Sequence, residues 1–233
     1  MVRLIQHNRF RLCVTLLQPM TEFNLLVGGP PAMWPAELAQ QTAVPWIAAD
    51  RGALRLLELG ITPQVAVGDF DSLSTAELKR VQTQVADIRY AVADKDETDT
   101  ELALNIALTE GQATRVTIYG ATGGRLDHLL DNLFMLLQPR FLPYCQRVRL
   151  LDRQNSLRLF LPGVHTITRE ARQQYLAFAP LTAVKGLTLY DTKYKLANAD
   201  YAQPIMFASN QFTKKSATFS FRTGVVAVIQ SHD

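Results

Sequence analysis

The sequence predicts an α/β class followed by a β class: an N-terminal doubly wound, mostly parallel α/β domain and a C-terminal β-sandwich. Two observations predict this. From Phe23 onward, short apolar segments alternate with helical segments, which is typical of a mostly parallel sheet covered on both faces. Later in the chain, short strands follow one another without a long helix, which is typical of a sandwich. Pro139 and Pro143 separate the two patterns, so we expect domains over residues 21–142 and 146–233.

The elements of the α/β half follow from its apolar runs and helical periodicity. Strands are expected at Phe23–Val27, Val44–Ala49, Val65–Val67, Ile88–Val92 and Val116–Tyr119. Helices are expected at Gly52–Leu59, Thr75–Val85, Thr98–Glu110 and Arg125–Leu137. In such a sheet, ligands bind outside the carboxyl ends of the strands. The polar residues that follow each strand are therefore the functional candidates.

The β half is divided by turn signals such as Pro162-Gly163 and Thr223-Gly224. Its strands are expected at Val148–Leu151, Leu157–Leu161, Val164–Ile167, Tyr175–Ala179, Leu187–Tyr190, Ala217–Phe221 and Val225–Ile229. Residues 1–20 combine three arginines with a short apolar patch, and we expect them to form an appendage to the α/β domain. An extra edge strand is the alternative for that segment.

Composition excludes several classes of protein. The chain has 233 residues, of which 48% are hydrophobic and 19% charged, as in an ordinary globular protein. A net charge of +3 without a long basic run does not indicate nucleic-acid binding, and no apolar stretch approaches the roughly 18–20 residues that span a membrane. Cys13 and Cys145 lie far apart and form neither a zinc motif nor a disulfide framework, so we expect a cytoplasmic protein.

The segment Gly68-Asp69-Phe70-Asp71-Ser72 follows an apolar strand. Alternation along an extended segment places Asp69 and Asp71 on one side, and two carboxylates held close together are unfavourable unless a cation lies between them. This pattern indicates a Mg²⁺ site, because Mg²⁺ prefers carboxylate oxygens. The alternative is a polar turn in which Asp71 or Ser72 caps the next helix.

Two further segments place carboxylates after expected strands. Asp50 ends one strand just before Gly52 opens a helix, and an N-cap is its alternative role. The segment from Asp94 to Asp99 is dense in carboxylates. Thr98 with Glu101 fits a capping box, but that motif does not explain why Lys95, Asp96, Glu97 and Asp99 crowd the same turn.

A glycine-rich turn joins the strand that ends at Tyr119 to the next helix. Its residues are Gly120-Ala121-Thr122-Gly123-Gly124-Arg125-Leu126-Asp127-His128. Backbone N–H groups and a helix N-terminus form an anion cradle, and Arg125 can grip phosphate oxygens. A tight turn without a ligand is the alternative for the glycines, and packing is the alternative for His128. Together, the carboxylates and the cradle predict Mg²⁺-assisted phosphoryl transfer.

These segments, in this order, resemble the thiamine pyrophosphokinase family. The resemblance rests on Ala49-Asp50-Arg51-Gly52-Ala53, Leu59-Gly60-Ile61-Thr62-Pro63, residues 68–72, residues 95–99, residues 120–128, Ser209-Asn210 and Gly224. It covers the chain from about residue 23 to the end. It implies transfer of the pyrophosphoryl group of ATP to the hydroxyl of thiamine, with AMP as the second product. It also implies a homodimer in which thiamine lies between the α/β domain of one subunit and the sandwich of the other.

The resemblance also implies roles for individual residues. The catalytic residues would be Asp69, Asp71, Asp96 and Asp99, with Mg²⁺ held by Asp69, Asp71 and Asp99. ATP would be contacted by Asp50, Lys95, Thr98, Thr122, Gly123, Gly124, Arg125 and Asp127. Thiamine would be recognised by Ser209 and Asn210 of the partner subunit. Either Asp71 or Asp99 would accept the hydroxyl proton.

The chain departs from the family pattern at a few positions. Arg51 stands where many members have Gly, and Gln211 stands where Glu commonly follows the Ser-Asn pair. No tryptophan lies in the second half, which excludes a tryptophan stacking partner from that half. A diphosphokinase for another heterocyclic alcohol, such as a pterin, is an alternative. A non-catalytic thiamine- or nucleotide-binding regulator is another, although uncompensated carboxylates argue against it.

Overall fold

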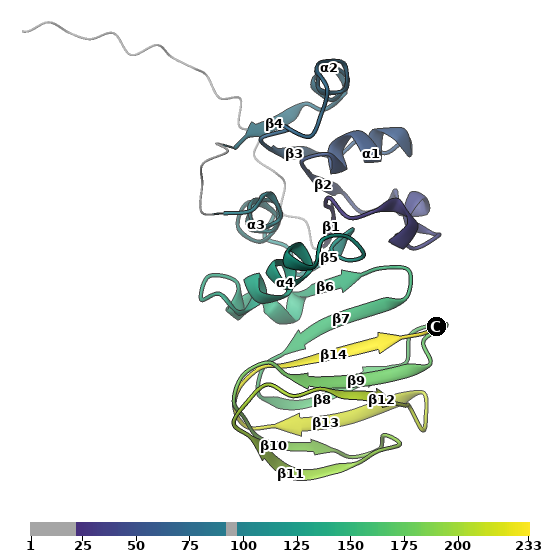
Figure 1. Cartoon of the computed structure of the whole chain (residues 1–233), viewed down its shortest axis with the longest axis vertical. Helices are drawn as coiled ribbons and strands as arrows, with labels where there is room; N and C mark the ends of the chain where they lie inside the picture. The colour runs from purple at the N-terminus through teal and green to yellow at the C-terminus, as the bar shows by residue number, and fades with distance from the viewer. Residues whose placement is uncertain (1–21, 92–96) are drawn as a thin grey trace, which may run out of the picture.

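The computed structural model describes residues 22–91 and 97–233, and its fold rests on a ten-stranded sheet and a four-stranded sheet (Figure 1). The large sheet has the strand order β12 (Phe207–Asn210), β9 (Tyr175–Pro180), β14 (Val226–Ser231), β7 (Asn155–Phe160), β6 (Val148–Leu151), β5 (Arg115–Tyr119), β1 (Glu22–Leu26), β2 (Trp46–Ala49), β3 (Val65–Gly68) and β4 (Asp87–Tyr90). The appendage expected over residues 1–20 lies outside the described residues.

The six neighbouring strands β6, β5, β1, β2, β3 and β4 are all parallel. The order in which the chain adds strands to the sheet changes sides at β1. After β1, the chain adds β2, β3 and β4 on one side, and then β5 and β6 on the other. The carboxyl ends of β1 and β5 therefore form a topological switch point, where open α/β sheets bind their ligands.

Helices cover both faces of the parallel part of the sheet, as expected. They are α1 (Gly52–Glu58), α2 (Thr75–Gln84), α3 (Asp99–Asn105) and α4 (Leu126–Phe134). Short 3₁₀ helices also occur at η1 (Pro31–Met33), η2 (Leu38–Gln40), η4 (Met135–Leu137) and η5 (Leu142–Arg147). On one face, Leu56 of α1 and Val81 of α2 join a core with Leu26 and Ala48. On the other face, α3 and the segment that follows α4 pack on alternate strand residues. The helix expected over 98–110 changes at Ile106 into a five-residue π-helix, η3 (Ile106–Glu110).

The second half forms the expected sandwich, but one of its layers is the antiparallel end of the large sheet. That layer consists of β7, β14, β9 and β12. The other layer has the order β11 (Leu196–Tyr201), β10 (Val184–Leu189), β13 (Ser216–Phe221) and β8 (Gly163–Thr168). Phe178 and Phe219 meet edge to face between the layers, with ring centroids 5.2 Å apart. The predicted fold class is confirmed, although β11 and β12 were not expected.

The domain division stays a prediction, and the backbone hydrogen bonds continue across it through the antiparallel pair β6–β7. Among the described residues, no helix has the length and apolar character needed to cross a bilayer.

Candidate active site

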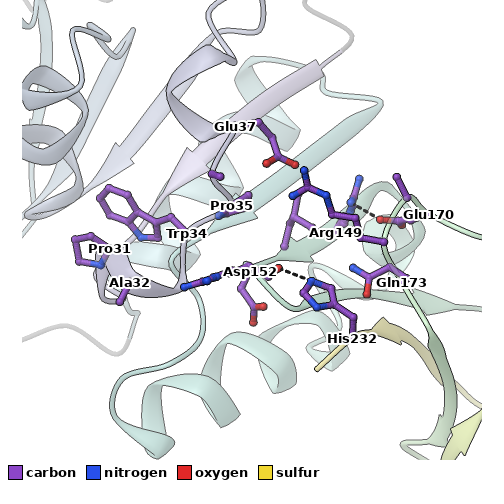
Figure 2. Close-up of a pocket in the computed structure, with 15 residues that line it drawn as sticks. Pro31, Ala32, Trp34, Pro35, Glu37, Arg149, Asp152, Glu170, Gln173 and His232 are labelled. Carbon is purple, nitrogen blue, oxygen red and sulfur yellow. Dashed lines mark hydrogen bonds and ion pairs between the residues drawn. The ribbon is translucent and has the colours of Figure 1, made fainter.

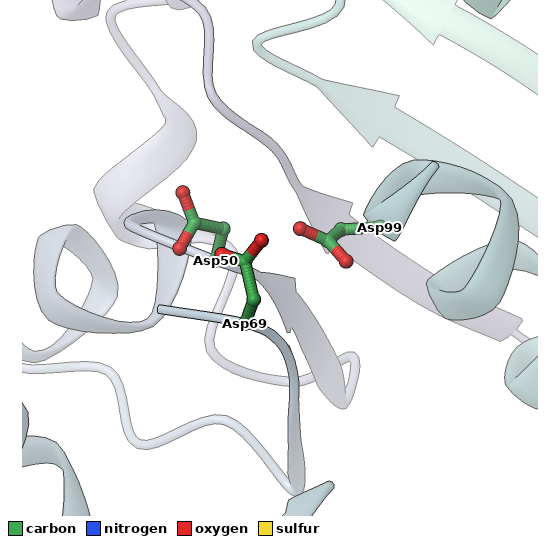
Figure 3. A group of neighbouring side chains, drawn as sticks. All are labelled: Asp50, Asp69 and Asp99. Atoms are coloured by element: carbon green, nitrogen blue, oxygen red, sulfur yellow. The ribbon is translucent and has the colours of Figure 1, made fainter. Parts of the chain in front are cut away.

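Three carboxylates converge at the carboxyl edge of the parallel sheet (Figure 3). Asp50 follows β2, Asp69 follows β3 and Asp99 is the first residue of α3. One carboxylate oxygen from each residue lies within 4.8 Å of the other two. Neighbouring parallel strands end side by side, which explains how residues so distant in the sequence meet. We call this group the acidic trio.

Asp50 does not cap α1, which corrects the alternative role considered from the sequence. Its backbone is in the left-handed region, with φ of 46°, and α1 has no side-chain N-cap. Ser72 Oγ donates a hydrogen bond to Asp50 Oδ2 at 2.7 Å, whereas the other oxygen, Oδ1, is buried and has no hydrogen-bond partner among the described residues. An unpartnered buried carboxylate oxygen is costly, so this atom indicates a missing ligand.

Asp71 lies beside the trio rather than within it. The backbone of Phe70 takes a φ of 58°, which is unusual for an aromatic residue, and its buried ring packs edge to face on Tyr90. This twist interrupts the alternation expected for the segment, so Asp71 is exposed and donates its backbone N–H to Asp69 Oδ1 at 3.0 Å. The negative charge of Asp69 is the main cause that raises the pKa of the Asp71 carboxyl, and desolvation and the charge of Asp50 raise it further.

The helix-cap alternative for Asp71 and Ser72 is wrong. Ser74 is the N-cap of α2, and it forms a capping box with Glu77. Arg51 instead tethers the Asp69–Ser72 loop, since its guanidinium donates hydrogen bonds to the Ser72 carbonyl and to Glu77 Oε1. Arg51 thus helps to hold the loop that presents Asp69 and Asp71.

The acidic turn before α3 is only partly described. The capping box predicted for Thr98 and Glu101 is present, since Thr98 N–H donates to Glu101 Oε2 at 2.9 Å and Glu101 N–H donates to Thr98 Oγ1 at 3.3 Å. The Thr98 hydroxyl therefore has a structural partner already. The predicted Lys95 and Asp96 lie outside the described residues.

A pocket of about 210 Å³ lies at the switch point between β1 and β5, beside the trio. Its wall includes the predicted turn, with Thr122, Gly124 and Arg125, and also Gly28 and Gly29, which the sequence analysis missed. The two consecutive glycines directly after the first strand were the sequence feature that could have identified this part of the pocket. Gly29 N–H donates to the Gly120 carbonyl at 2.7 Å, and a Cβ on Gly29 would lie only 2.1 Å from that oxygen. Only glycine permits this close approach.

The glycine turn has free donors that face solvent. Gly123 and Gly124 are exposed, and within the described residues their backbone N–H groups donate no hydrogen bond. Gly123 has a φ of 80° and lies against the side chain of Met33. Thr122 Oγ1 donates to Asp152 Oδ2 at 2.6 Å, so the hydroxyl anchors the turn. These donors at the start of α4 suit an anion.

Arg125 and Asp127 form an exposed ion pair at the start of α4, with Arg125 Nη2 2.5 Å from Asp127 Oδ2. The hydrogen bond from Arg125 is the main cause that lowers the pKa of Asp127. Exposed pairs of this kind contribute little to stability. The guanidinium can therefore exchange Asp127 for a phosphate at small cost.

The structure does not bring Ser209 and Asn210 to the trio within one chain. They lie on β12, at the edge of the sheet that is opposite to β3 and β4 (Figure 1). Asn210 is buried, and its amide bonds the backbone of Tyr194 and Gln211. Ser209 is exposed, with φ of 58°. The amide of Asn210 therefore orders the neighbouring loop. The ring of Tyr194 in that loop is exposed, and no role was predicted for it from the sequence.

Comparison with known proteins places this geometry in a family. Residues 36–146 match the model for the thiamin pyrophosphokinase catalytic domain, and residues 164–226 match that for the thiamin pyrophosphokinase vitamin B1 binding domain. The thiamine pyrophosphokinase of Bacillus subtilis (strain 168) is 35% identical over 218 residues, which is 92% of this chain and 100% of that protein.

Solved structures agree with these matches. A protein from Lactobacillus plantarum is 50% identical with a TM-score of 0.84, covering 92% of this chain and 100% of its own. A thiamin pyrophosphokinase family protein from Enterococcus faecalis is 45% identical with a TM-score of 0.86, covering 91% of this chain and 100% of its own. The chain belongs to the thiamin pyrophosphokinase family.

Proposed function

We propose that this protein is an enzyme that transfers the diphosphate group of ATP to the hydroxyl of thiamine. The observation that carries the proposal is the acidic trio, with its unpartnered Asp50 oxygen, next to the glycine-rich turn at the switch point. We call this turn, residues 120–125, the glycine cradle. The family supports ATP and thiamine as the substrates. In the reaction, the thiamine oxygen forms a bond to the β-phosphorus, the bond between that phosphorus and the α-phosphate oxygen breaks, and AMP leaves.

The residues present fit a divalent cation. Carboxylate oxygens are the ligands that Mg²⁺ prefers, and Asp50 Oδ1 is a buried oxygen that needs a partner. We assign Asp50, Asp69 and Asp99 as the ligand set, with Asp71 as an additional donor beside them. This set adds Asp50 to the ligands predicted from the sequence. When bound, Mg²⁺ would neutralise the negative charge of the transferred phosphates.

The remaining chemistry belongs to the chain itself. The free N–H groups of Gly123 and Gly124 orient phosphate oxygens, and Arg125 neutralises charge on them. The hydroxyl proton of thiamine passes to a neighbouring carboxylate, for which Asp71 and Asp99 are the candidates. We retain Lys95, Thr98 and Asp127 as proposed contacts of ATP, with Asp96 in support, on the basis of the family resemblance.

We also propose that the active enzyme is a homodimer whose sites are shared. Eight strand steps separate β12 from β3, which at about 4.8 Å per step is roughly 38 Å. A side chain near Ser209 cannot span this distance, so a thiamine that contacts both the trio and β12 must lie between two copies. Tyr194, with 58% of its surface exposed, then offers an aromatic face to the thiamine rings.

Exposed apolar surface on both halves supports this assembly. Leu126, Leu130 and Phe134 form one stripe along α4 and are 67%, 41% and 52% exposed. Just before β12, Ile205 and Met206 are 42% and 52% exposed. Exposed apolar patches of this kind mark interaction sites. A twofold pairing of the α4 stripe with the Ile205–Met206 patch would bury both, twice per dimer.

The function is tested by incubating the protein with ATP, Mg²⁺ and thiamine and measuring AMP. We expect AMP and thiamine diphosphate in equal amounts, and we expect Asp69→Asn to reduce the rate by more than about a hundredfold. Arg80→Gln, an exposed change on α2, is the control and should keep full activity. Turnover of a pterin alcohol but not of thiamine would overturn the proposal. We also assign the enzyme to the cytoplasm, where its free, buried Cys145 stays reduced.

A further inference from the structure

A second and larger cavity, of about 660 Å³, lies apart from the trio and the glycine cradle (Figure 2). It is enclosed by the turn after β1, which includes Trp34 and Glu37, by the end of β6, and by the turn between β8 and β9. His232, near the C-terminus, completes its wall. None of the residues that line it belongs to the acidic trio or to the pocket at the switch point.

The cavity contains a buried acceptor that needs a donor. Gln173 is only 6% exposed and its Oε1 has no hydrogen-bond partner among the described residues. Figure 2 shows its side chain on the same wall as His232, across the cavity from the Trp34–Glu37 turn. Glu37 lines the cavity as a second acceptor, and it has no ion-pair partner among the described residues. An unsatisfied buried carbonyl costs free energy, which an N–H donor on a ligand would recover.

The rim of the cavity carries unpaired positive charge. Arg153 and Arg172 are exposed, and neither forms an ion pair within the described part of the chain. The third arginine of the lining, Arg149, is neutralised by Glu170 at 2.6 Å. Arg172 has a φ of 69°, a conformation that a non-glycine residue adopts at a cost. Two free guanidinium groups suit the oxygens of a phosphate.

The cavity is joined to the glycine cradle by direct contacts. Arg153 N–H donates to the Met33 carbonyl at 2.7 Å, and the Met33 side chain lies against Gly123. Asp152, at the cavity wall, accepts the hydrogen bond from Thr122 of the cradle. A ligand that orders the end of β6 would therefore act on the turn that we assign to phosphate binding.

We propose that this cavity is a second ligand site for a phosphate ester that carries an amino-substituted heteroaromatic ring. The amino group would donate to Gln173 Oε1, the ring would lie against Trp34, and the phosphate would bind Arg153 and Arg172. Resting on the proposed function, both products of the reaction have this chemistry, since AMP has an aminopurine and thiamine diphosphate an aminopyrimidine. The site would thus let a product restrain the enzyme through the cradle.

The test is calorimetric titration of the full chain with AMP alone and, separately, with thiamine diphosphate alone. We expect one of the two products to bind twice per chain, and the arm that shows the second site identifies the regulator. Gln173→Leu and Arg172→Gln should each weaken that second site by about fivefold or more and leave the first site unchanged. Arg80→Gln is the matched control for loss of a surface charge and should retain both sites.

Kinetics supply a second readout. At a fixed ATP concentration, the wild type should show product inhibition that saturating thiamine, which has no phosphate, does not relieve. Arg172→Gln, which changes only an exposed side chain, should lose that inhibition with kcat unchanged. A single site per chain for both products, with the same affinity in the variants, would overturn the proposal. So would a raised KM for ATP in Gln173→Leu, which would assign the cavity to substrate. Because binding is measured without turnover, either result is independent of the assay that tests the proposed function.

Discussion

Asp69 and Asp71 are two like charges held on one short loop, and the metal-free protein bears the cost of their repulsion. The pKa of Asp71 is raised above its usual value because ionisation places a second negative charge beside Asp69. A raised pKa in the folded state means that the folded chain binds this proton more tightly than the unfolded chain does. Stability is therefore lost as the pH rises from below about 4 through the folded pKa.

Replacing Asp71 by Asn should stabilise the metal-free protein and inactivate the enzyme. We expect a higher Tm than that of the wild type at pH 7, with a difference that vanishes near pH 3, where the wild-type carboxyl is protonated. Thermal unfolding in the presence of a chelator measures both. Equal Tm values at pH 7 would show that the repulsion is not felt by the folded state, and full activity would remove Asp71 from the site.

At this scale, the residue types were predictable but their grouping was not. The sequence placed carboxylates after the strands, and the structure joins Asp50, rather than Asp71, to Asp69 and Asp99. The reason is backbone conformation. Asp50 and Phe70 both adopt positive φ, which turns their neighbours away from the directions that simple alternation predicts. No local composition rule signals such a conformation at an aspartate or a phenylalanine.

At the scale of elements, the turn after β5 was predicted from the sequence and the turn after β1 was not. The turn after Tyr119 was recognised because its glycines precede a helix. The pair Gly28-Gly29 was overlooked because the sequence after it shows no helical periodicity, although it lines the pocket at the switch point. The strands β1 and β5 and the helix α4 were predicted within a few residues, since hydrophobic periodicity specifies them. The short helix η1 after β1 was not predicted.

Substituting Ala at these two glycines should separate a packing requirement from simple proximity to the site. A Cβ on Gly29 would meet the Gly120 carbonyl oxygen at 2.1 Å, whereas a Cβ on Gly28 has nothing within 4 Å. We expect Gly29→Ala to lower the free energy of unfolding by about 1–3 kcal/mol and to raise the KM for ATP, because the ends of β1 and β5 must separate. Gly28→Ala, the neighbouring control, should change stability little. Urea unfolding and steady-state kinetics provide both numbers, and similar behaviour of the two variants would contradict the close approach.

For the whole molecule, the distance between the trio and β12 predicts that two defective chains can restore each other. Asp69→Asn disables the α/β side of a shared site, and Tyr194→Ala disables the side that the partner contributes. Each variant alone should be nearly inactive. A dimer with one chain of each kind has one intact site and one doubly defective site, so an equal mixture that has exchanged subunits should recover about a quarter of wild-type activity.

The control for this experiment is a mixture of Asp69→Asn with Asp99→Asn. Both changes lie on the same side of the site, so no combination of these chains contains an intact one, and the mixture should stay inactive. Recovery there, or none in the first mixture, would contradict the shared arrangement. The sequence predicted the dimer only through the family resemblance, because neither the span of the sheet nor the exposed stripe on α4 can be read from composition.

The continuous large sheet has a consequence for how the enzyme opens and closes. The two halves are joined by the ladder of β6 and β7, where Arg149, Leu150 and Leu151 pair with Arg158, Leu157 and Ser156. A hinge between the halves would have to break that ladder, so rigid-body domain closure over the substrates is not available to a single subunit. Exclusion of water must then come from loops at the sheet edge and from the second subunit. We expect the motion of those loops to set the rate of product release.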